Sequence, residues 1–212
     1  MKFMIKICGV TRPEDAAYAA SVGATAIGLN FWPGSKRFVD DGRAREIIAA
    51  IPDGVLRVGV FVNAHPLVVT ETLAELGLDL IQLHGDERVS AWEELPAKRI
   101  VRAIRVYDDV SLKEALAWDP AFFIFDAHTP SFGGAGVTAP WGLIAEGARR
   151  PFLLAGGLTP ENVAAAIHMV RPDGVDVASG VEAGVPGIKD RGLLAAFVHN
   201  AREAAAAIGA GL

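Results

Sequence analysis

The sequence contains one cysteine among its 212 residues, so no disulfide bond can form within a single chain. A lone cysteine, Cys8, is typical of a reducing compartment, and we expect a cytoplasmic protein. No run reaches the ~18 apolar residues that span a bilayer. The apolar start, MKFMIKICGV, is too short for a signal peptide and lacks a small-residue cleavage site. We therefore expect no membrane partner.

Neither sign of charge dominates, because 20 Lys and Arg stand against 25 Asp and Glu, a formal net charge of −5. Nucleic-acid binders usually carry a basic patch, so we expect no nucleic-acid partner. Hydrophobic residues make up 51% of the chain, too many for a disordered protein. No linker or low-complexity segment interrupts the sequence, which favours one domain over residues 1–212.

Short apolar runs alternate with helical stretches along the whole chain, and several of the predicted helices begin with a capping residue followed by proline or an acid. The predicted strands are Phe3–Cys8, Thr25–Asn30, Arg57–Val62, Leu80–His84, Ile100–Arg105, Phe122–Asp126, Pro151–Ala155 and Gly174–Ala178. The predicted helices are Pro13–Ser21, Gly42–Ile51, Pro66–Leu76, Val89–Leu95, Ser111–Trp118, Pro140–Ala148, Pro160–His168 and Arg191–Ile208. Eight strand–helix units predict an α/β protein with a (β/α)₈ TIM barrel. A doubly wound open sheet is the alternative.

Active sites of such barrels lie at the carboxyl ends of the strands. The residues at these ends are polar for positions that close buried runs: Cys8, Asn30, Asn63, His84 and Asp126, then Gly156-Gly157, Asp176 and Ser179-Gly180.

Cys8 is a candidate base. Alternation along a strand places Lys6 and Cys8 on one face. A nearby ammonium lowers a thiol pKa from about 8.5, which predicts a usable thiolate near neutral pH. The alternative is an inert cysteine that packs as a small hydrophobe.

Asp126 is a candidate acid, because it ends the apolar run FFIFD, where partial desolvation raises a carboxyl pKa. A helix or loop cap is the alternative. His84 either hydrogen-bonds a substrate or bonds a neighbouring carbonyl. Arg37, in the loop WPGSKRF, either clamps a carboxylate or is a solvated charge.

Two glycine-rich turns, at Gly156-Gly157 and Ser179-Gly180, follow the last two strands. Glycine lets backbone N–H groups approach an anion, and barrel enzymes commonly bind phosphate after these strands. The alternative is ordinary turns. The other histidines, His65, His128, His168 and His199, have no metal-ligand spacing, so we expect no metal.

The segments KICGVTRPEDA, GLNFWPGSKRFV, VGVFVN, IQLHGDE, LLAGGLTPENV and GVDVASGVEAGVPGIKD resemble, in order, those of the phosphoribosylanthranilate isomerase family of tryptophan biosynthesis. The resemblance implies a (β/α)₈ barrel that needs no cofactor. It also implies an Amadori rearrangement of N-(5-phosphoribosyl)anthranilate to 1-(2-carboxyphenylamino)-1-deoxyribulose 5-phosphate. The expected partner is this small phosphorylated substrate, while a monomer and a homodimer both stay open.

By the same resemblance, Asp126 is the general acid, Cys8 the general base and Arg37 the ligand of the anthranilate carboxylate. His84 and Asp176 match residues that line the family's pocket. Gly156, Gly157, Ser179 and Gly180 match its phosphate loops.

One segment departs from the family pattern. After the strand Phe122–Asp126 the family usually has Gly-Gly-Thr-Gly and then an aromatic-Asp-Trp, whereas this chain has Ala135 for the threonine and Ala139-Pro140 before Trp141. Two further hypotheses stay open, and only the second rests on this departure. One is another phosphate-binding barrel isomerase or synthase, which the cysteine at position 8 disfavours. The other is an inactive barrel that acts as a binding subunit.

Overall fold

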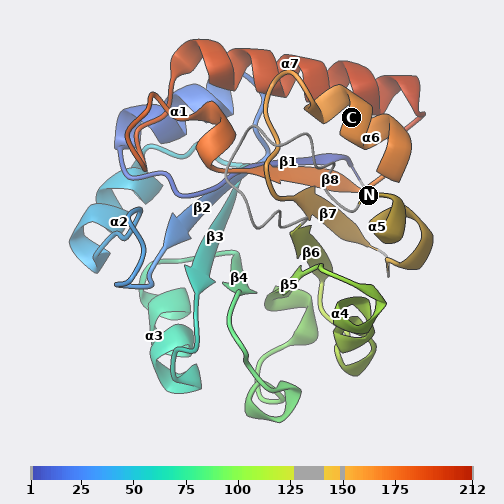
Figure 1. Ribbon diagram of the computed structural model, residues 1–212. Coiled ribbons are helices and arrows are strands. Elements are labelled where there is room, and N and C mark those ends of the chain that lie inside the picture. The colour runs from blue at the N-terminus through green and yellow to red at the C-terminus, as the bar shows by residue number, and fades with distance from the viewer. Residues whose placement is uncertain (1, 127–140, 149–150, 212) are drawn as a thin grey trace.

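The computed structural model describes residues 2–126, 141–148 and 151–211 of the chain, in which eight parallel strands form a closed barrel (Figure 1). The order around the barrel is the order along the chain, and β8 pairs with β1. The strands are β1 Met4–Ile7, β2 Ala26–Asn30, β3 Leu56–Phe61, β4 Leu80–Leu83, β5 Ile100–Arg105, β6 Phe122–Asp126, β7 Phe152–Ala155 and β8 Gly174–Val177. The predicted (β/α)₈ barrel is confirmed, and the open sheet is excluded because β8 closes onto β1.

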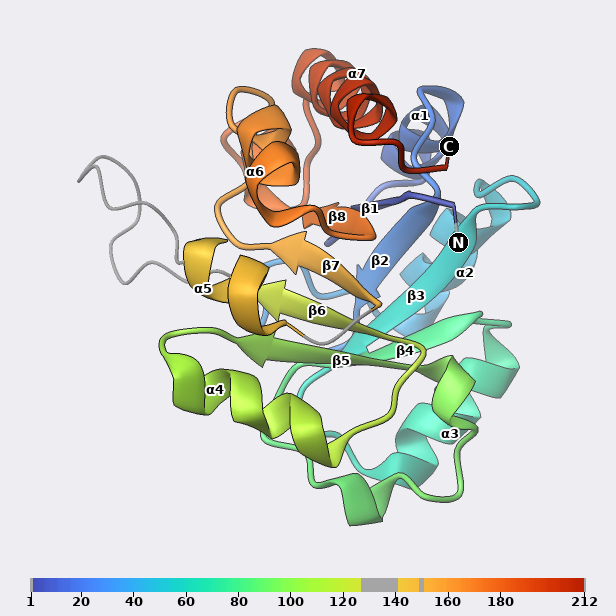
Figure 2. The same ribbon diagram turned by 90° about the vertical axis from the view of Figure 1, so that its right-hand side faces the viewer.

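Helices surround the barrel, as the perpendicular view shows for α4, α6 and α7 (Figure 2). The α-helices are α1 Pro13–Ser21, α2 Asp41–Ala49, α3 Pro66–Glu75, α4 Asp109–Lys113, α5 Trp141–Gly147, α6 Val163–Val170 and α7 Arg191–Ala207. The 3₁₀ helices are η1 Val89–Ala91, η2 Ala97–Arg99, η3 Glu114–Ala117 and η4 Ser179–Val181. None of the helices described here is long and apolar enough to cross a membrane.

The helix predicted over Val89–Leu95 is wrong, because only the short η1 forms there. Pro96 disfavours helical geometry at the residue before it, so a helix cannot continue to the end of this segment. Ser111–Trp118 likewise forms only the end of α4 and η3. The predicted helix Pro160–His168 begins later, at Val163.

A buried carboxylate fixes the loop after β4. Glu87, which follows β4, accepts hydrogen bonds from the backbone N–H groups of Gly85 and Asn63. It also accepts one from Arg102 Nη1 of β5, at 2.6 Å. This pair is almost completely buried, and it ties the β4 loop to the next strand.

Two apolar layers hold the fold together. One lies inside the barrel and consists of Met4, Ala26, Val58, Leu80, Val101, Ala103, Phe122, Ile124, Leu153 and Ala155. The other packs the outer faces of the strands against the helices. Lys6, Gln82 and Asp176 also face the inside of the barrel, because side chains alternate along a strand and each stands two residues after a member or neighbour of the inner layer. They lie nearer the carboxyl ends of the strands than those residues do. A buried polar layer therefore forms the floor of the barrel mouth.

Candidate active site

A cavity of about 610 Å³ opens at the carboxyl ends of the strands. Its lining includes Cys8, Arg37, His84, Asp126, Gly156, Gly157, Asp176 and Ser179, together with Gly9, Asn30, Val60, Gln82, Ala155, Leu158, Thr159, Val177 and Ala178. Of the predicted site residues, only Gly180 is outside this lining. Gly180 packs against the backbone of Leu158, so its missing side chain lets the loops after β7 and β8 approach each other.

One wall of the cavity holds a buried ion pair. Lys6 Nζ donates to Asp176 Oδ1 at 2.9 Å, and the Lys6 side chain is fully buried. Burial alone lowers the pKa of Lys6, but the opposing effects of Asp176 and Cys8 raise it, so the ammonium stays charged. On β2, Gly28 provides the space, since a Cβ there would lie 2.9 Å from Cys8 Sγ and 3.1 Å from Lys6 Nζ.

The predicted pKa of the Cys8 thiol is wrong in direction. Burial raises this pKa above its ordinary value, and the nearby Asp176 carboxylate adds to the rise. Lys6 and Lys189 lower it by less than burial and Asp176 together raise it. The sequence argument counted the ammonium on the same strand face and left out desolvation and the carboxylate. In the ligand-free protein the thiol is therefore the dominant form at neutral pH.

The opposite wall carries the candidate acid. Asp126 Oδ2, at the end of β6, lies 3.8 Å from His84 Nε2, and each of the two side chains is 24% exposed. Burial, helped by Arg105, lowers the pKa of His84 to about 4, so the imidazole is neutral at pH 7. The contact is therefore a neutral imidazole beside a carboxyl group.

Gln82 holds the orientation of the His84 ring. Its side-chain amide lies 3.0 Å from His84 Nδ1, and the other ring nitrogen, Nε2, is the atom that faces Asp126. Gln82 Oε1 is buried, and it has no hydrogen-bond partner within the described ranges. The sequence analysis missed Gln82, although its position two residues before His84 on one strand places both on the same face.

The glycine turns supply backbone donors. Gly156 and Gly157 have φ values of 87° and 64°, which favour glycine. Within the residues that the structure covers, no hydrogen bond uses the N–H group of either glycine. The Asn162 side chain braces the turn, because it donates to the Gly157 carbonyl and accepts from Thr159 N–H. The turn can therefore present unpaired N–H groups to an anion.

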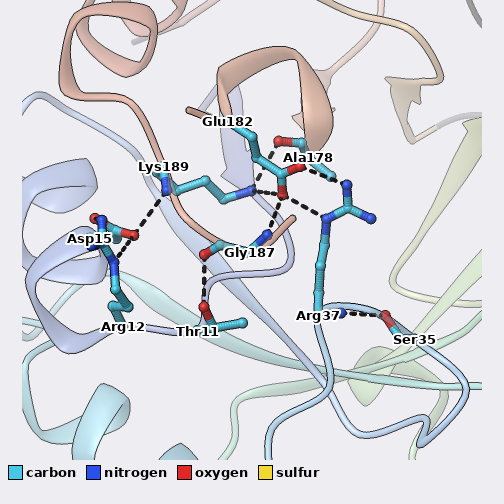
Figure 3. A network of polar contacts seen from close by, with 9 residues as sticks. All are labelled: Thr11, Arg12, Asp15, Ser35, Arg37, Ala178, Glu182, Gly187 and Lys189. Atoms are coloured by element: carbon cyan, nitrogen blue, oxygen red, sulfur yellow. Dashed lines mark hydrogen bonds and ion pairs between the residues drawn. The ribbon is translucent and has the colours of Figure 1, made fainter. Parts of the chain in front are cut away.

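The Arg37 side chain lines the cavity and is paired with a carboxylate of this chain. Arg37 Nε and Nη2 donate to Glu182 Oε1 and Oε2 at 2.6 and 2.7 Å (Figure 3). Lys189 Nζ lies 3.2 Å from Glu182 Oε1. The sequence analysis named neither partner, although both charges stand in the small-residue loop GVEAGVPGIKD after the last strand.

Across the described ranges, no group of three or more His, Cys, Asp or Glu side chains could hold a metal ion. The altered segment Gly133–Pro140 and His128 lie outside the described residues. The sequence interpretation of that segment is therefore not addressed by the structure.

A closed parallel barrel whose carboxyl-end cavity is lined by a thiol, a carboxyl group and glycine turns has the architecture of a (β/α)₈-barrel enzyme. A family model described as N-(5'-phosphoribosyl)anthranilate (PRA) isomerase matches residues 5–200. N-(5'-phosphoribosyl)anthranilate isomerase of Neisseria meningitidis serogroup B is 43% identical over 203 residues, which cover 94% of this chain and 97% of the relative.

Solved structures agree with this match. Phosphoribosyl anthranilate isomerase from Thermotoga maritima has a TM-score of 0.85 and 38% identity, covering 95% of this chain and 99% of its own. A structure of the isomerase in complex with reduced 1-(o-carboxyphenylamino)-1-deoxyribulose 5-phosphate has a TM-score of 0.81 and 36% identity, with the same coverage. The chain belongs to the N-(5'-phosphoribosyl)anthranilate isomerase family, and it is an isomerase of tryptophan biosynthesis.

Proposed function

We propose that residues 1–212 act as one catalytic domain that converts N-(5-phosphoribosyl)anthranilate to 1-(2-carboxyphenylamino)-1-deoxyribulose 5-phosphate, with Asp126 as general acid and Cys8 as general base. The observation that carries the proposal is the single cavity that Cys8 of the β1 end and Asp126 of the β6 end both line. A small substrate held between them can take a proton from one group and give a proton to the other.

Asp126 acts first in this scheme. It protonates the furanose ring oxygen, the C1–O bond breaks, and the nitrogen lone pair forms a Schiff base with C1. The position of Asp126 after the apolar run of β6 supports this role, because burial of that run limits solvation of the carboxyl group. The neutral His84 beside it adds no positive charge that would favour the carboxylate form.

Cys8 acts second. Its thiolate removes the proton from C2 of the ribose, and the electrons of the C–H bond form the enolamine, which tautomerises to the ketone. Lys6 and Lys189 both favour the thiolate, but burial and Asp176 together outweigh them. The thiolate fraction therefore grows with pH above neutrality, and we expect kcat/KM to rise over the same range.

Two further contacts hold the ends of the substrate. The turns at Gly156-Gly157 and Ser179-Gly180 offer backbone N–H groups to the phosphate. Arg37 offers guanidinium donors to the anthranilate carboxylate. His84 and Asp176 line the space between, and the scheme needs no cofactor.

The test is turnover, followed as loss of the fluorescent anthranilate substrate, in the wild type and two variants. Asp126→Asn and Cys8→Ser should each lower kcat by about 10²–10⁴-fold, since each removes a positioned proton-transfer group. Asp119→Asn, on an exposed aspartate outside the cavity, is the matched control and should turn over normally.

A wild-type chain without turnover would overturn the proposed activity and leave the binding-subunit hypothesis. An Asp126→Asn variant with more than about a tenth of wild-type kcat would assign the acid to another residue. A cytoplasmic location and the choice between monomer and homodimer stay predictions of the sequence.

A further inference from the structure

The pair Arg37–Glu182 joins two loops that are far apart in the chain. Arg37 follows β2 and Glu182 follows β8, and the two bonds between them are parallel, at 2.6 and 2.7 Å. A guanidinium group is planar and can present two double-donor edges, one made by Nε and one Nη atom and the other by both Nη atoms. Glu182 occupies the first edge, so the edge formed by Nη1 and Nη2 is the one left for another carboxylate (Figure 3).

Glu182 itself does not line the cavity, whereas Arg37 does. The Glu182 side chain is 7% exposed, against 25% for Arg37. Any influence of Glu182 on a ligand must therefore pass through Arg37 or through the loop that both support.

Lys189 balances the buried carboxylate. Its side chain is fully buried, and Nζ donates to Glu182 Oε1 at 3.2 Å and to the Ala178 carbonyl at 2.9 Å. Burial tends to raise the pKa of Glu182, but Arg37, Gly187 and Lys189 together lower it. Glu182 is thus a negative charge between two basic side chains. Burial lowers the pKa of Lys189, and the nearby Glu182 opposes that effect.

The backbone around Glu182 is also fixed. Gly187 N–H donates to Glu182 Oε1 at 2.9 Å, and the Gly187 carbonyl accepts from Thr11 Oγ1 at 2.8 Å. Lys189 N–H donates to Asp15 Oδ2 at 3.0 Å. These bonds anchor the β8 loop to the loop and helix that follow β1, so Glu182 has a rigid support (Figure 3).

The other side of Arg37 is bounded by Gly9. A Cβ at this position would overlap the Arg37 side chain, and Gly9 has a φ of 65°. The stem of Arg37 therefore runs across the backbone next to Cys8, with Glu182 fixing its tip. Few rotamers of a long side chain satisfy both constraints.

We infer that Glu182, held by Lys189, is a positioning residue that fixes the plane of Arg37 so that the Nη1–Nη2 edge receives the carboxylate on the substrate's aromatic ring. The inference rests on the proposed function. Glu182 does not touch the substrate; it selects for ligands that carry a carboxylate by orienting the group that binds it. Removing Glu182 frees the guanidinium to rotate, so only ligands with a carboxylate lose affinity.

The test compares two ligands: reduced 1-(o-carboxyphenylamino)-1-deoxyribulose 5-phosphate and the same compound without the carboxyl group. Titration calorimetry with Glu182→Gln should show about ten- to a hundredfold weaker binding of the carboxylated ligand. Binding of the ligand without the carboxyl group should change by less than about twofold, which also shows that the phosphate end of the pocket is intact. In turnover, KM should rise by a larger factor than kcat falls.

Arg37→Ala is the second variant in the titrations, and it should abolish the preference for the carboxylated ligand. Adding Glu182→Gln to Arg37→Ala should not weaken binding of that ligand further, because the two residues act as one unit. Glu182→Asp keeps the negative charge beside Lys189, but its side chain is shorter and reaches Arg37 less well. It should weaken binding of the carboxylated ligand by an intermediate factor. It also keeps the test available if Glu182→Gln does not fold. Glu203→Gln, on the exposed face of α7, is the matched control.

Equal losses for both ligands in Glu182→Gln, or a further loss in the Arg37→Ala background, would overturn the inference. A wild-type chain that binds neither ligand would instead overturn the proposed function. The two failures are therefore distinguishable in one set of titrations.

Discussion

The two sides of the barrel mouth hold their polar groups in different ways. On the side of β1, β2 and β8, the polar groups are full charges in pairs, Lys6 with Asp176, and Glu182 with Arg37 and Lys189. On the side of β4 to β6, the groups that line the cavity are a neutral imidazole, His84, and Asp126 beside it. The charged pair of that side, Arg102 with Glu87, does not line the cavity.

The difference follows from what each side has to do in the proposed reaction. A thiolate and a bound carboxylate are anions, and buried cations favour both. A carboxylic acid must hold its proton until it donates it, and the neutral imidazole of His84 adds no positive charge that would favour the carboxylate. At one wall Lys6 and Lys189 therefore favour the thiolate against the effect of burial, and at the other wall the neutral imidazole adds no positive charge.

The largest effect should come from breaking the charged side at its most buried pair. Lys6→Met leaves the Asp176 carboxylate without its cation, and removal of one partner of a buried pair typically costs about 3–5 kcal/mol. It also removes a group that lowers the Cys8 pKa, so iodoacetamide should react more slowly with the thiol at a given pH. Urea unfolding and the pH dependence of alkylation measure the two effects.

The double variant Lys6→Met/Asp176→Asn is the control for the charge. It should recover much of the lost stability, because no uncompensated charge remains inside the barrel. If the single and double variants were equally unstable, packing of the Lys6 stem, and not the ion pair, would hold this wall.

The neutral side should respond to pH instead. The pKa of His84 is about 4 in the folded protein, against an ordinary value of 6.5. Between these values the unfolded chain binds more protons, so the free energy of unfolding falls as the pH drops from 6.5 to 4. The full loss is about 3 kcal/mol, and His84→Gln should remove this part of the pH dependence.

Chemical denaturation of the wild type and of His84→Gln at a series of pH values measures this loss of stability. His168→Gln, on an exposed histidine of α6, should keep the wild-type slope. An unchanged slope in His84→Gln would mean that the pKa of His84 in the folded protein is close to its ordinary value.

The smallest effect should come from the contact between the loops that follow β7 and β8. A side chain at Gly180 would meet the carbonyl oxygen of Leu158, and a backbone atom cannot move away cheaply. Gly180→Ala should separate the two loops at a cost of about 1–3 kcal/mol. If both loops bind the phosphate, the inhibition constant of inorganic phosphate should rise about tenfold.

Gly142→Ala is the matched control, because a Cβ at this position of α5 meets nothing within 4 Å. It should leave phosphate inhibition unchanged. Equal inhibition constants in Gly180→Ala and the wild type would mean that the phosphate binds to one loop alone or elsewhere.

Much of the site could be predicted because parallel strands all end at the same rim of a barrel. Cys8, His84 and Asp126 could be placed together from their positions at strand ends, without any knowledge of contacts. Two-residue alternation also placed Lys6 beside Cys8 correctly.

Two features of the site could be established only from the three-dimensional structure. The direction of the Cys8 pKa depends on how burial compares with several charges, one of them on β8. The partner of Arg37 lies 145 residues away, and no local pattern links Glu182 to it. The segment after β4 was misjudged for a local reason, because its apolar residues fit a helical spacing that Pro96 does not support.

The space at Gly28 has an evolutionary consequence. Cys8 and Lys6 belong to one strand, but they can occupy their positions only if the neighbouring strand carries no side chain at position 28. An ancestor with a larger residue there could not gain the cysteine by a single substitution, since the new thiol would have no place. The three positions are therefore expected to be inherited as a set, and a descendant that replaces the glycine is released from keeping the cysteine.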